Sequence, residues 1–320
     1  MNPLLAQADK LQLPNVEYSR FLPILILIGG ALGILVLASL LGRRVPEVVW
    51  TVLSVSTAGA GGIAAAWLWN DIQKGHQGPG TAVSGALRID GFSVWFALLI
   101  CSAVALFSLM ADGYVQRERL GGPEIHVLAL LSGSGGMLMA FSNDLLVLFL
   151  GLEILSIALY VMAGYHRRRS ESGEAAMKYF VLGAFSSAIF LYGVALVYGA
   201  TGTTRLDQMN PVLGFIVRAN ADRSVALAGM DAHGNRNLAL AGMALLIVGL
   251  GFKVAAVPFH TWTPDVYQGS PSPVTGFMAA AAKAAGFAGL MRVLTLGLLP
   301  LRHDWRPAIW ALAALTLLVG

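Results

Sequence analysis

Eight stretches of the chain are apolar for about 20 residues each, and this feature constrains the fold most. A helix needs about 20 apolar residues to cross a hydrocarbon core about 30 Å thick. Charged residues make up only 12% of the 320 residues, against about 25% in soluble domains. This excludes a soluble globular protein. We therefore predict an all-α polytopic membrane protein with spans at about 21–41, 47–69, 91–111, 124–142, 144–165, 174–200, 238–262 and 274–298.

A ninth apolar stretch begins near Arg306 and stops at Gly320. Fifteen residues of helix reach only about 22 Å, which is too short to cross the bilayer. We therefore expect the sequence to be the front part of a longer chain.

The arginines between the spans predict an orientation. They follow spans one, three and five, at Arg43, Arg44, Arg117, Arg119 and Arg167–Arg169. The loop after span two holds only Lys74 and Arg88. By the positive-inside rule the arginine-rich loops face the cytoplasm and the N-terminus lies outside. The loop of about residues 201–237 weakens this prediction, because it would be external yet carries four arginines. The net charge of +4 fits these loops better than a nucleic-acid partner.

The sequence favours a chain without a redox cofactor of its own. The single cysteine, Cys101, excludes disulfides, thiolate zinc sites and iron–sulfur clusters, which need several cysteines. The glycine-rich run at residues 133–136 lies inside a span rather than between a strand and a helix, so it is no nucleotide fingerprint.

Ionisable residues inside the spans are the strongest functional candidates. Glu153 lies ten residues into its span and Lys283 ten residues past Pro273, so both are expected near mid-membrane. Lys253 precedes Pro258, which cannot donate its backbone N–H, so the helix is expected to break just after the lysine. A lysine beside a broken helix is typical of ion and proton pathways. The alternative is a static buried ion pair that only locks helices together.

Other polar residues give weaker predictions. Lys178 follows Glu174 by four residues and could form a surface pair with it. His260 follows the predicted break and could relay protons or cap the loop. Arg292 lies near a span end and is expected to extend to the interface. Three aromatic residues near span ends are interpreted as belt residues at the membrane surface: Tyr160, Tyr165 and Trp262.

Residues 252–273 read FKVAAVPFHTWTPDVYQGSPSP, and this run closely resembles the N-type membrane subunit of proton-pumping NADH:quinone oxidoreductase, respiratory complex I. The segments LGLEILS around Glu153, EAAMKY at 174–179 and AAK at 281–283 are similar to the same family. The resemblance implies an antiporter-like fold of two inverted five-helix repeats with a broken transmembrane helix. Residues 1–123 would hold three N-terminal spans, 124–298 the first repeat, and 299–320 the truncated start of the second.

The resemblance also implies roles for five residues. Glu153 and Lys253 would form the pair that gates a proton half-channel, and Lys283 would pass protons onward. Lys178 would contribute to the same route, with His260 as a weaker candidate. FMN, iron–sulfur clusters and quinone would be bound by partner subunits, and the other membrane subunits of complex I and the lipid bilayer would be the partners.

Three functions follow from these observations. The first is a proton-translocating subunit of NADH:quinone oxidoreductase. The second is a subunit of a multi-subunit cation/proton antiporter, which would need no redox partner. The third is a non-conducting scaffold, for which neutral replacements at Glu153 and Lys283 would damage assembly rather than transport. The Ala/Gly/Arg-rich composition suggests a bacterial plasma membrane.

Overall fold

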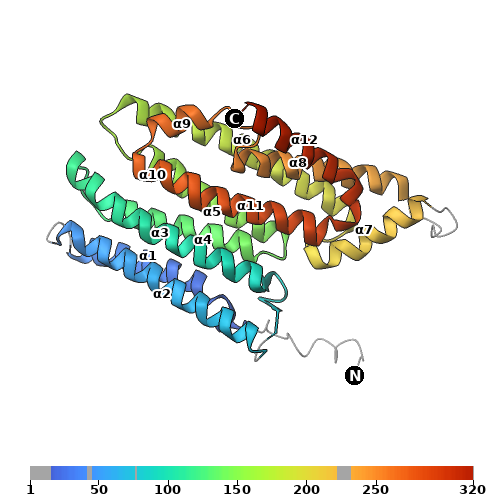
Figure 1. The fold of residues 1–320 in the computed structure, drawn as a ribbon, viewed down its shortest axis with the longest axis horizontal. Coiled ribbons are helices and arrows are strands. Elements are labelled where there is room, and N and C mark those ends of the chain that lie inside the picture. Colours follow the sequence, from blue (N-terminus) through green and yellow to red (C-terminus); the bar gives the residue numbers. More distant parts are fainter. Residues whose placement is uncertain (1–15, 42–44, 76–77, 222–231, 320) are drawn as a thin grey trace, which may run out of the picture.

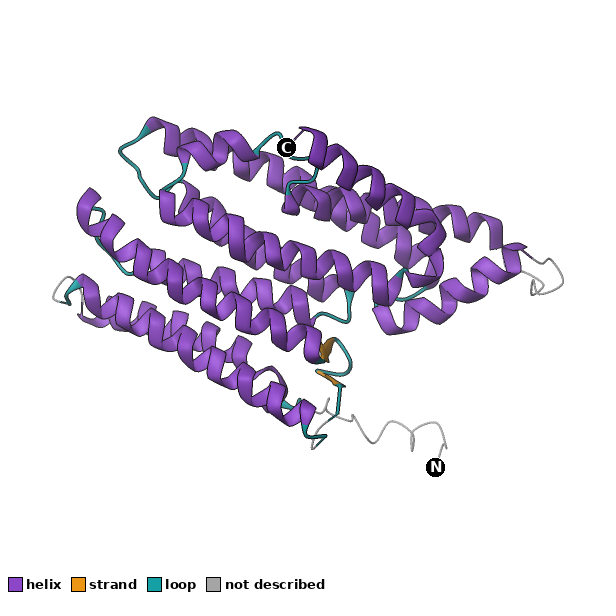
Figure 2. Ribbon diagram, in the orientation of Figure 1, coloured by secondary structure: helices purple, strands orange, loops and turns teal. Residues whose placement is uncertain are grey.

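A computed structural model describes residues 16–41, 45–75, 78–221 and 232–319 as a bundle of long helices lying side by side (Figures 1 and 2). Within these residues, eight helices are long and apolar enough to cross a membrane, which confirms the predicted number. They are α1 (Leu22–Leu41), α2 (Glu47–Gln73), α3 (Gly91–Glu118), α4 (Glu124–Phe141), α5 (Leu145–Ala163), α6 (Ser170–Thr201), α8 (Ala232–Val254) and a composite eighth helix. The eighth joins α10 (Ser272–Phe277), a π-helical turn η4 (Met278–Ala282), α11 (Lys283–Arg292) and a second π-helical turn η5 (Val293–Gly297).

Shorter elements connect or flank these spans. They are η1 (Tyr18–Phe21), the antiparallel strands β1 (Gly80–Ala82) and β2 (Leu87–Ile89), α7 (Leu206–Ala221), α9 (Thr263–Gly269), η6 (Leu299–Leu301) and α12 (Arg302–Val319). α7 corrects the prediction of a loop over about 201–237. Its apolar residues Leu206, Met209, Leu213 and Ile216 recur every three or four positions, and this face is buried.

Polar caps fix where two of the spans begin. Asp90 accepts a hydrogen bond from the backbone N–H of Ser93, and Ser93 Oγ accepts one from the Asp90 N–H, so α3 starts with a complete capping box. Asp144 caps α5 by accepting from the Leu146 N–H, and its other oxygen accepts from Thr204. These caps satisfy N–H groups that have no partner within the helix.

The predicted break after Lys253 is confirmed. α8 ends at Val254, and the chain turns irregularly until α9 begins at Thr263. The span therefore ends eight residues before the predicted 262. Pro258 lies in this interval and cannot supply an N–H to a continuing helix.

α6 is an unbroken helix of 32 residues that packs against both α8 and α9. Against α8 the two backbones meet at Gly193 and Gly242, where a Cβ on Gly242 would lie 2.9 Å from the Gly193 carbonyl oxygen. Against α9, a Cβ on Gly269 would lie 2.5 Å from the Glu171 carbonyl oxygen. α6 therefore holds the two halves of the broken helix on one continuous support.

Three of the loop arginines on which the predicted orientation depends lie together. Arg119, Arg167 and Arg168 line a single surface pocket, although they come from two different loops. We call this the arginine-rich end. Arg43 and Arg44, which also supported the predicted orientation, lie outside the described residues.

Arg292 does not extend to the interface, and that prediction is wrong. Its side chain is 4% exposed and donates to both carboxylate oxygens of Asp90, at 2.7 and 2.5 Å. It also donates to the Ala140 carbonyl and lies 4.5 Å from the centre of the Phe92 ring. A carboxylate before α3 therefore neutralises it inside the protein.

Candidate functional site

Glu153 and Lys283 lie near the middle of their helices, whereas Lys253 lies in the last turn of α8, at the break. Glu153 is eight residues past Leu145 in the 19-residue α5, about 12 Å from its start. Lys253 reaches Tyr179, which lies about 14 Å along α6 from Ser170. Lys283 is eleven residues past Ser272, about 16 Å along its helix. Glu153 and Lys283 therefore lie at mid-helix positions, and Lys253 lies at the helix break that the sequence predicts.

Lys253 is buried, with 5% of its surface exposed, and hydrogen bonds hold its side-chain nitrogen between two helices. Its Nζ donates to Ser156 Oγ of α5 at 2.9 Å and to the Tyr179 hydroxyl of α6 at 3.3 Å. Ser156 Oγ donates its own proton to the Leu152 carbonyl, so its lone pairs face the lysine. The site is thus built where α5, α6 and α8 meet.

Glu153 lies one helical turn from Ser156 on α5, which places it on the face that carries the Lys253 contact. Its carboxylate accepts a short hydrogen bond from Ser187 of α6. Among the ion pairs of the described residues, none joins Glu153 to Lys253. The structure therefore brings both residues to one site and holds them on separate serines.

Aromatic rings enclose Lys253. Trp262 stacks on Tyr179 with ring centres 4.6 Å apart, and Tyr160 meets Tyr179 edge-on at 4.8 Å. Trp262 also donates to the Phe252 carbonyl, which accepts a second hydrogen bond from the Ala255 N–H at the end of α8. Tyr160 is 8% exposed and Trp262 3% exposed. The prediction that both are belt residues is therefore wrong, and they pack around the tyrosine that holds Lys253.

Lys283 lies in a different environment from Lys253. It follows the π-helical turn η4 directly, and its Nζ lies 5.6 Å from the centre of the Tyr267 ring, a cation–π contact. The side chain is half-buried. π-helical turns are rare overall, and those that occur are often found at functional sites.

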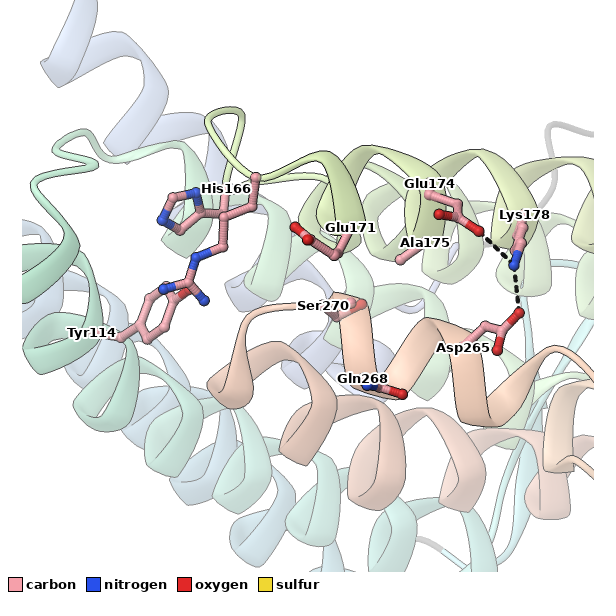
Figure 3. Close-up of a pocket in the computed structure, with 11 residues that line it drawn as sticks. Tyr114, His166, Glu171, Glu174, Ala175, Lys178, Asp265, Gln268 and Ser270 are labelled. Atoms are coloured by element: carbon pink, nitrogen blue, oxygen red, sulfur yellow. Dashed lines mark hydrogen bonds and ion pairs between the residues drawn. The ribbon is translucent and has the colours of Figure 1, made fainter.

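Lys178 lies in a cleft at the arginine-rich end rather than beside Lys253 (Figure 3). Its Nζ lies 2.7 Å from Glu174 and 2.5 Å from Asp265, which belongs to α9. The predicted pair with Glu174 is therefore present. The contact with Asp265 adds a link between α6 and α9 that the sequence did not predict.

His260 is half-buried in the irregular segment that follows α8. Its Nδ1 is buried and has no hydrogen-bond partner in the described part of the chain. Within the same residues, no group of three or more His, Cys, Asp or Glu side chains is placed to hold a metal ion.

Sequence reasoning missed the residues that hold the two charges in place, namely Ser156, Tyr179 and Ser187. Serine and tyrosine are common in transmembrane helices, so the residue type alone does not predict a functional role. The spacing could have indicated Ser156, because it follows Glu153 by three residues and therefore lies on the same helix face.

The family model described as NADH:quinone oxidoreductase/Mrp antiporter, transmembrane, matches residues 142–320, which include every candidate site residue. The chain belongs to this family. The match begins just before α5, so the NADH:quinone oxidoreductase/Mrp antiporter signature covers the broken helix and the site, whereas α1 to α4 precede it.

Curated relatives of this family carry the name NADH-quinone oxidoreductase subunit N. One from Mycobacterium tuberculosis is 54% identical and is matched over 66% of this chain and 37% of its own length. One from Trichlorobacter lovleyi is 42% identical over 76% of this chain and 47% of the relative. One from Parafrankia is 40% identical over 98% of this chain and 60% of the relative. The chain spans about half the length of the curated relatives it matches.

Solved structures show the same antiporter-like fold. A chain of respiratory complex I from Thermus thermophilus is 34% identical, with a TM-score of 0.65, over 84% of this chain and 52% of that one. A chain of an archaeal membrane-bound sulfane sulfur reductase is 28% identical, with a TM-score of 0.68, over 87% and 53%. A chain of the Mrp complex from Dietzia shares the fold with a TM-score of 0.67 at 19% identity.

Proposed function

We propose that this chain is a membrane subunit of an NADH:quinone oxidoreductase and carries protons through a half-channel built on Glu153, Lys253 and Lys283. The observation that carries the proposal is the burial of Lys253 at a helix break, with its Nζ on Ser156 and Tyr179. An ionisable group at this depth is expensive, and it commonly marks an ion pathway. The names of the curated relatives support the same assignment.

The proposed mechanism depends on a change in the distance between the Glu153 carboxylate and the Lys253 ammonium group. Two opposite charges 4 Å apart attract by about 4 kcal/mol at an effective dielectric of about 20. Rotamer changes that bring the Glu153 carboxylate to Lys253 favour the protonated form of the lysine. When Glu153 is instead bound to Ser187, release of the proton from Lys253 is favoured. A proton moving through the membrane potential costs about 2.3 kcal/mol per 100 mV, which is a comparable energy.

Lys283 would receive the released proton and pass it on, and Lys178 and His260 would serve the route at its periphery. Partner subunits would supply FMN, iron–sulfur clusters and quinone, and their redox chemistry would drive the rearrangement. We further propose three N-terminal spans over 1–123, a first repeat over 124–298 and the start of an inverted second repeat over 299–320. The chain would lie in a bacterial plasma membrane with its N-terminus outside.

Lys253→Ala in the assembled complex tests the proposal. We expect NADH-driven proton uptake and coupled quinone reduction in proteoliposomes to fall together, because the carrier of the proton is lost. Comigration of the variant chain with the NADH-oxidising band on a native gel controls for assembly. Unchanged pumping by an assembled Lys253→Ala complex would contradict the proposal.

A cation/proton antiporter is the second candidate, supported by the shared fold of the Mrp complex chain. A native gel of gently solubilised membranes, stained for NADH oxidation and probed for this chain, separates the two. Comigration with a large NADH-oxidising band supports the first function. A smaller NADH-inert assembly with sodium–proton exchange supports the second.

A further inference from the structure

The pocket at the arginine-rich end concentrates positive charge from two loops. Arg119 comes from the loop after α3, and Arg167 and Arg168 come from the loop after α5. Within the residues that the structure describes, none of these three arginines forms an ion pair. The described lining of this pocket of about 250 Å³ includes one acidic residue, Glu124. Three guanidinium groups therefore face one carboxylate, and the pocket has an excess of positive charge.

An apolar groove of about 320 Å³ begins beside this pocket. Val127 and Leu128 of α4 line it, together with Leu35 of α1 and Val161 of α5. α4 packs against both α1 and α5, and Val127 is buried, whereas Leu35 is 49% and Val161 53% exposed. α4 is therefore the floor of the groove, and α1 and α5 are its walls. Tyr165 lines both the pocket and the groove, so the two are continuous.

The groove leads away from the charges and into the membrane-spanning part of the bundle. Leu128 is four residues past Glu124, the first residue of α4, which is about 6 Å along the helix. About one turn further from the pocket, Leu32 of α1 and Ile157 of α5 are also exposed. The apolar surface therefore continues toward the middle of the spans, whereas the arginines stay at its outer end.

A phospholipid has the chemistry that fits both parts. Guanidinium groups bind phosphate oxygens in a bidentate arrangement. Basic pockets between transmembrane helices on the cytoplasmic side bind anionic head groups, and arginine-rich loops face that side by the positive-inside rule. A choline or ethanolamine head group would bring a cation to a pocket that already has an excess of positive charge. A free anion would leave the groove empty, and an apolar helix alone would leave the arginines unpaired.

We infer that this surface binds one anionic phospholipid, with its phosphate on Arg119, Arg167 and Arg168 and an acyl chain in the groove between α1 and α5. The lipid joins the loop after α3 to the loop after α5, which the described ion pairs of these arginines do not. The inference does not depend on the proposed function, because the lipid touches none of the residues of the proposed proton route.

Photocrosslinking in the assembled complex tests the site. The complex is placed in phosphatidylcholine nanodiscs that contain a small fraction of phosphatidylglycerol with a diazirine on one acyl chain. We expect crosslinked peptides of α1 and α5 that contain Leu35 and Val161. We also expect unlabelled phosphatidylglycerol to compete. Equal crosslinking by the matching diazirine phosphatidylcholine would overturn the inference. So would the absence of crosslinks in the groove, which is the result expected if a partner protein covers it.

Two charge-matched variants test the contact with the head group. Arg119→Gln with Arg167→Gln removes one arginine of the pocket from each loop. Arg117→Gln with Arg169→Gln is the control, because these arginines lie two residues away in the sequence and pair with Glu118 instead. Each arginine near an anionic lipid changes the affinity about fivefold. We therefore expect the first variant to lose about 30-fold in affinity and the control to bind normally. Equal losses would show only a general attraction to the loops and would overturn the site.

Val161→Trp tests the acyl chain, because the larger side chain would fill the groove. Crosslinking to the α1 peptide that contains Leu35 should then be lost. Val181→Trp is the control, because Val181 of α6 is 54% exposed, like Val161, but does not line the groove. Inorganic phosphate should not compete with the lipid. Competition by phosphate, together with normal crosslinking in Val161→Trp, would mean that the pocket takes a free anion, and it would overturn the inference.

Discussion

Lys253 donates a hydrogen bond of 2.9 Å to Ser156, one helical turn along α5 from Glu153. The serine therefore holds the lysine on the α5 face that carries Glu153, while Glu153 itself binds Ser187. Because Ser156 gives its own proton to Leu152, it can only accept from the lysine. The contact that holds Lys253 is consequently directional, and we expect its removal to alter proton transfer without altering the fold.

Ser156→Ala is expected to slow coupled turnover about tenfold. A hydrogen bond to a charged group contributes about 1.5–3 kcal/mol, and each 1.36 kcal/mol of barrier is a factor of ten. The measurement is NADH-driven proton uptake by the assembled complex. Ser132→Ala is the control, because Ser132 is also buried and donates to α5 at the Leu155 carbonyl but does not touch the lysine. Equal effects of the two variants would mean that Ser156 acts only in packing.

Asp90→Asn should destabilise the protein at neutral pH and weaken its acid sensitivity. Burial disfavours the charged carboxylate, but the hydrogen bonds and the charge of Arg292 outweigh this and hold the Asp90 pKa below its ordinary value. Its stabilisation is therefore fully present above the ordinary pKa and is lost as pH falls through the lower folded-state pKa. Breaking a buried pair costs about 3–5 kcal/mol. Thermal unfolding in detergent between pH 3 and pH 7 measures both effects.

The double variant Asp90→Asn with Arg292→Met separates pairing from packing. It removes the stranded guanidinium as well as the carboxylate, so we expect it to recover much of the stability that Asp90→Asn loses. A double variant as unstable as the single one would show that the remaining contacts of Arg292, rather than its charge, hold α3 and α11 together.

Gly242→Val should destabilise the contact between α6 and α8. A Cβ at this position would lie 2.9 Å from both the Gly193 carbonyl oxygen and the Val197 backbone nitrogen, and neither can move alone. Overpacking of this kind costs about 1–3 kcal/mol. Gly29→Ala is the contrasting change, because nothing lies within 4 Å of its Cβ and alanine favours helix by about 1 kcal/mol. The unfolding temperature in detergent should fall for the first and not for the second.

Lys178→Ala should reduce proton uptake less than Lys253→Ala does. Lys178 is 41% exposed in the cleft, and its two carboxylate partners remain in contact with water when it is removed. Exposed ion pairs are screened by salt. The difference between Lys178→Ala and the unmodified complex should therefore shrink as the salt concentration rises. A loss as large as that of Lys253→Ala, at every salt concentration, would place Lys178 in the buried part of the route.

The charged part of the site could be predicted from the sequence, because Glu153, Lys253 and Lys283 stand out within apolar spans. The residues that surround these charges could not be predicted from the sequence. Tyr160 and Trp262 lie near span ends, and that position is shared by belt residues and by residues beside a broken helix. Arg292 was misassigned for a related reason, since its partner Asp90 lies 202 residues earlier in the chain. The burial of the two aromatic residues and the pairing of Arg292 both depend on contacts between segments that are distant in the sequence.

The helix bounds show a similar limit. The polar residues of 206–221 hid an amphipathic helix, although its apolar residues keep a helical spacing. The span over 238–262 was extended past Val254, because the apolar residues continue after the helix has ended. Hydropathy reports whether a residue avoids water and does not report whether its backbone is helical.

Lys178 and Tyr179 are consecutive residues of α6, yet Lys178 reaches the water of the cleft and Tyr179 touches the buried Lys253. One helix wall therefore insulates the lysine from the aqueous phase at the arginine-rich end. A group bound in the cleft would therefore act on Lys253 through one helix layer, without entering the buried site.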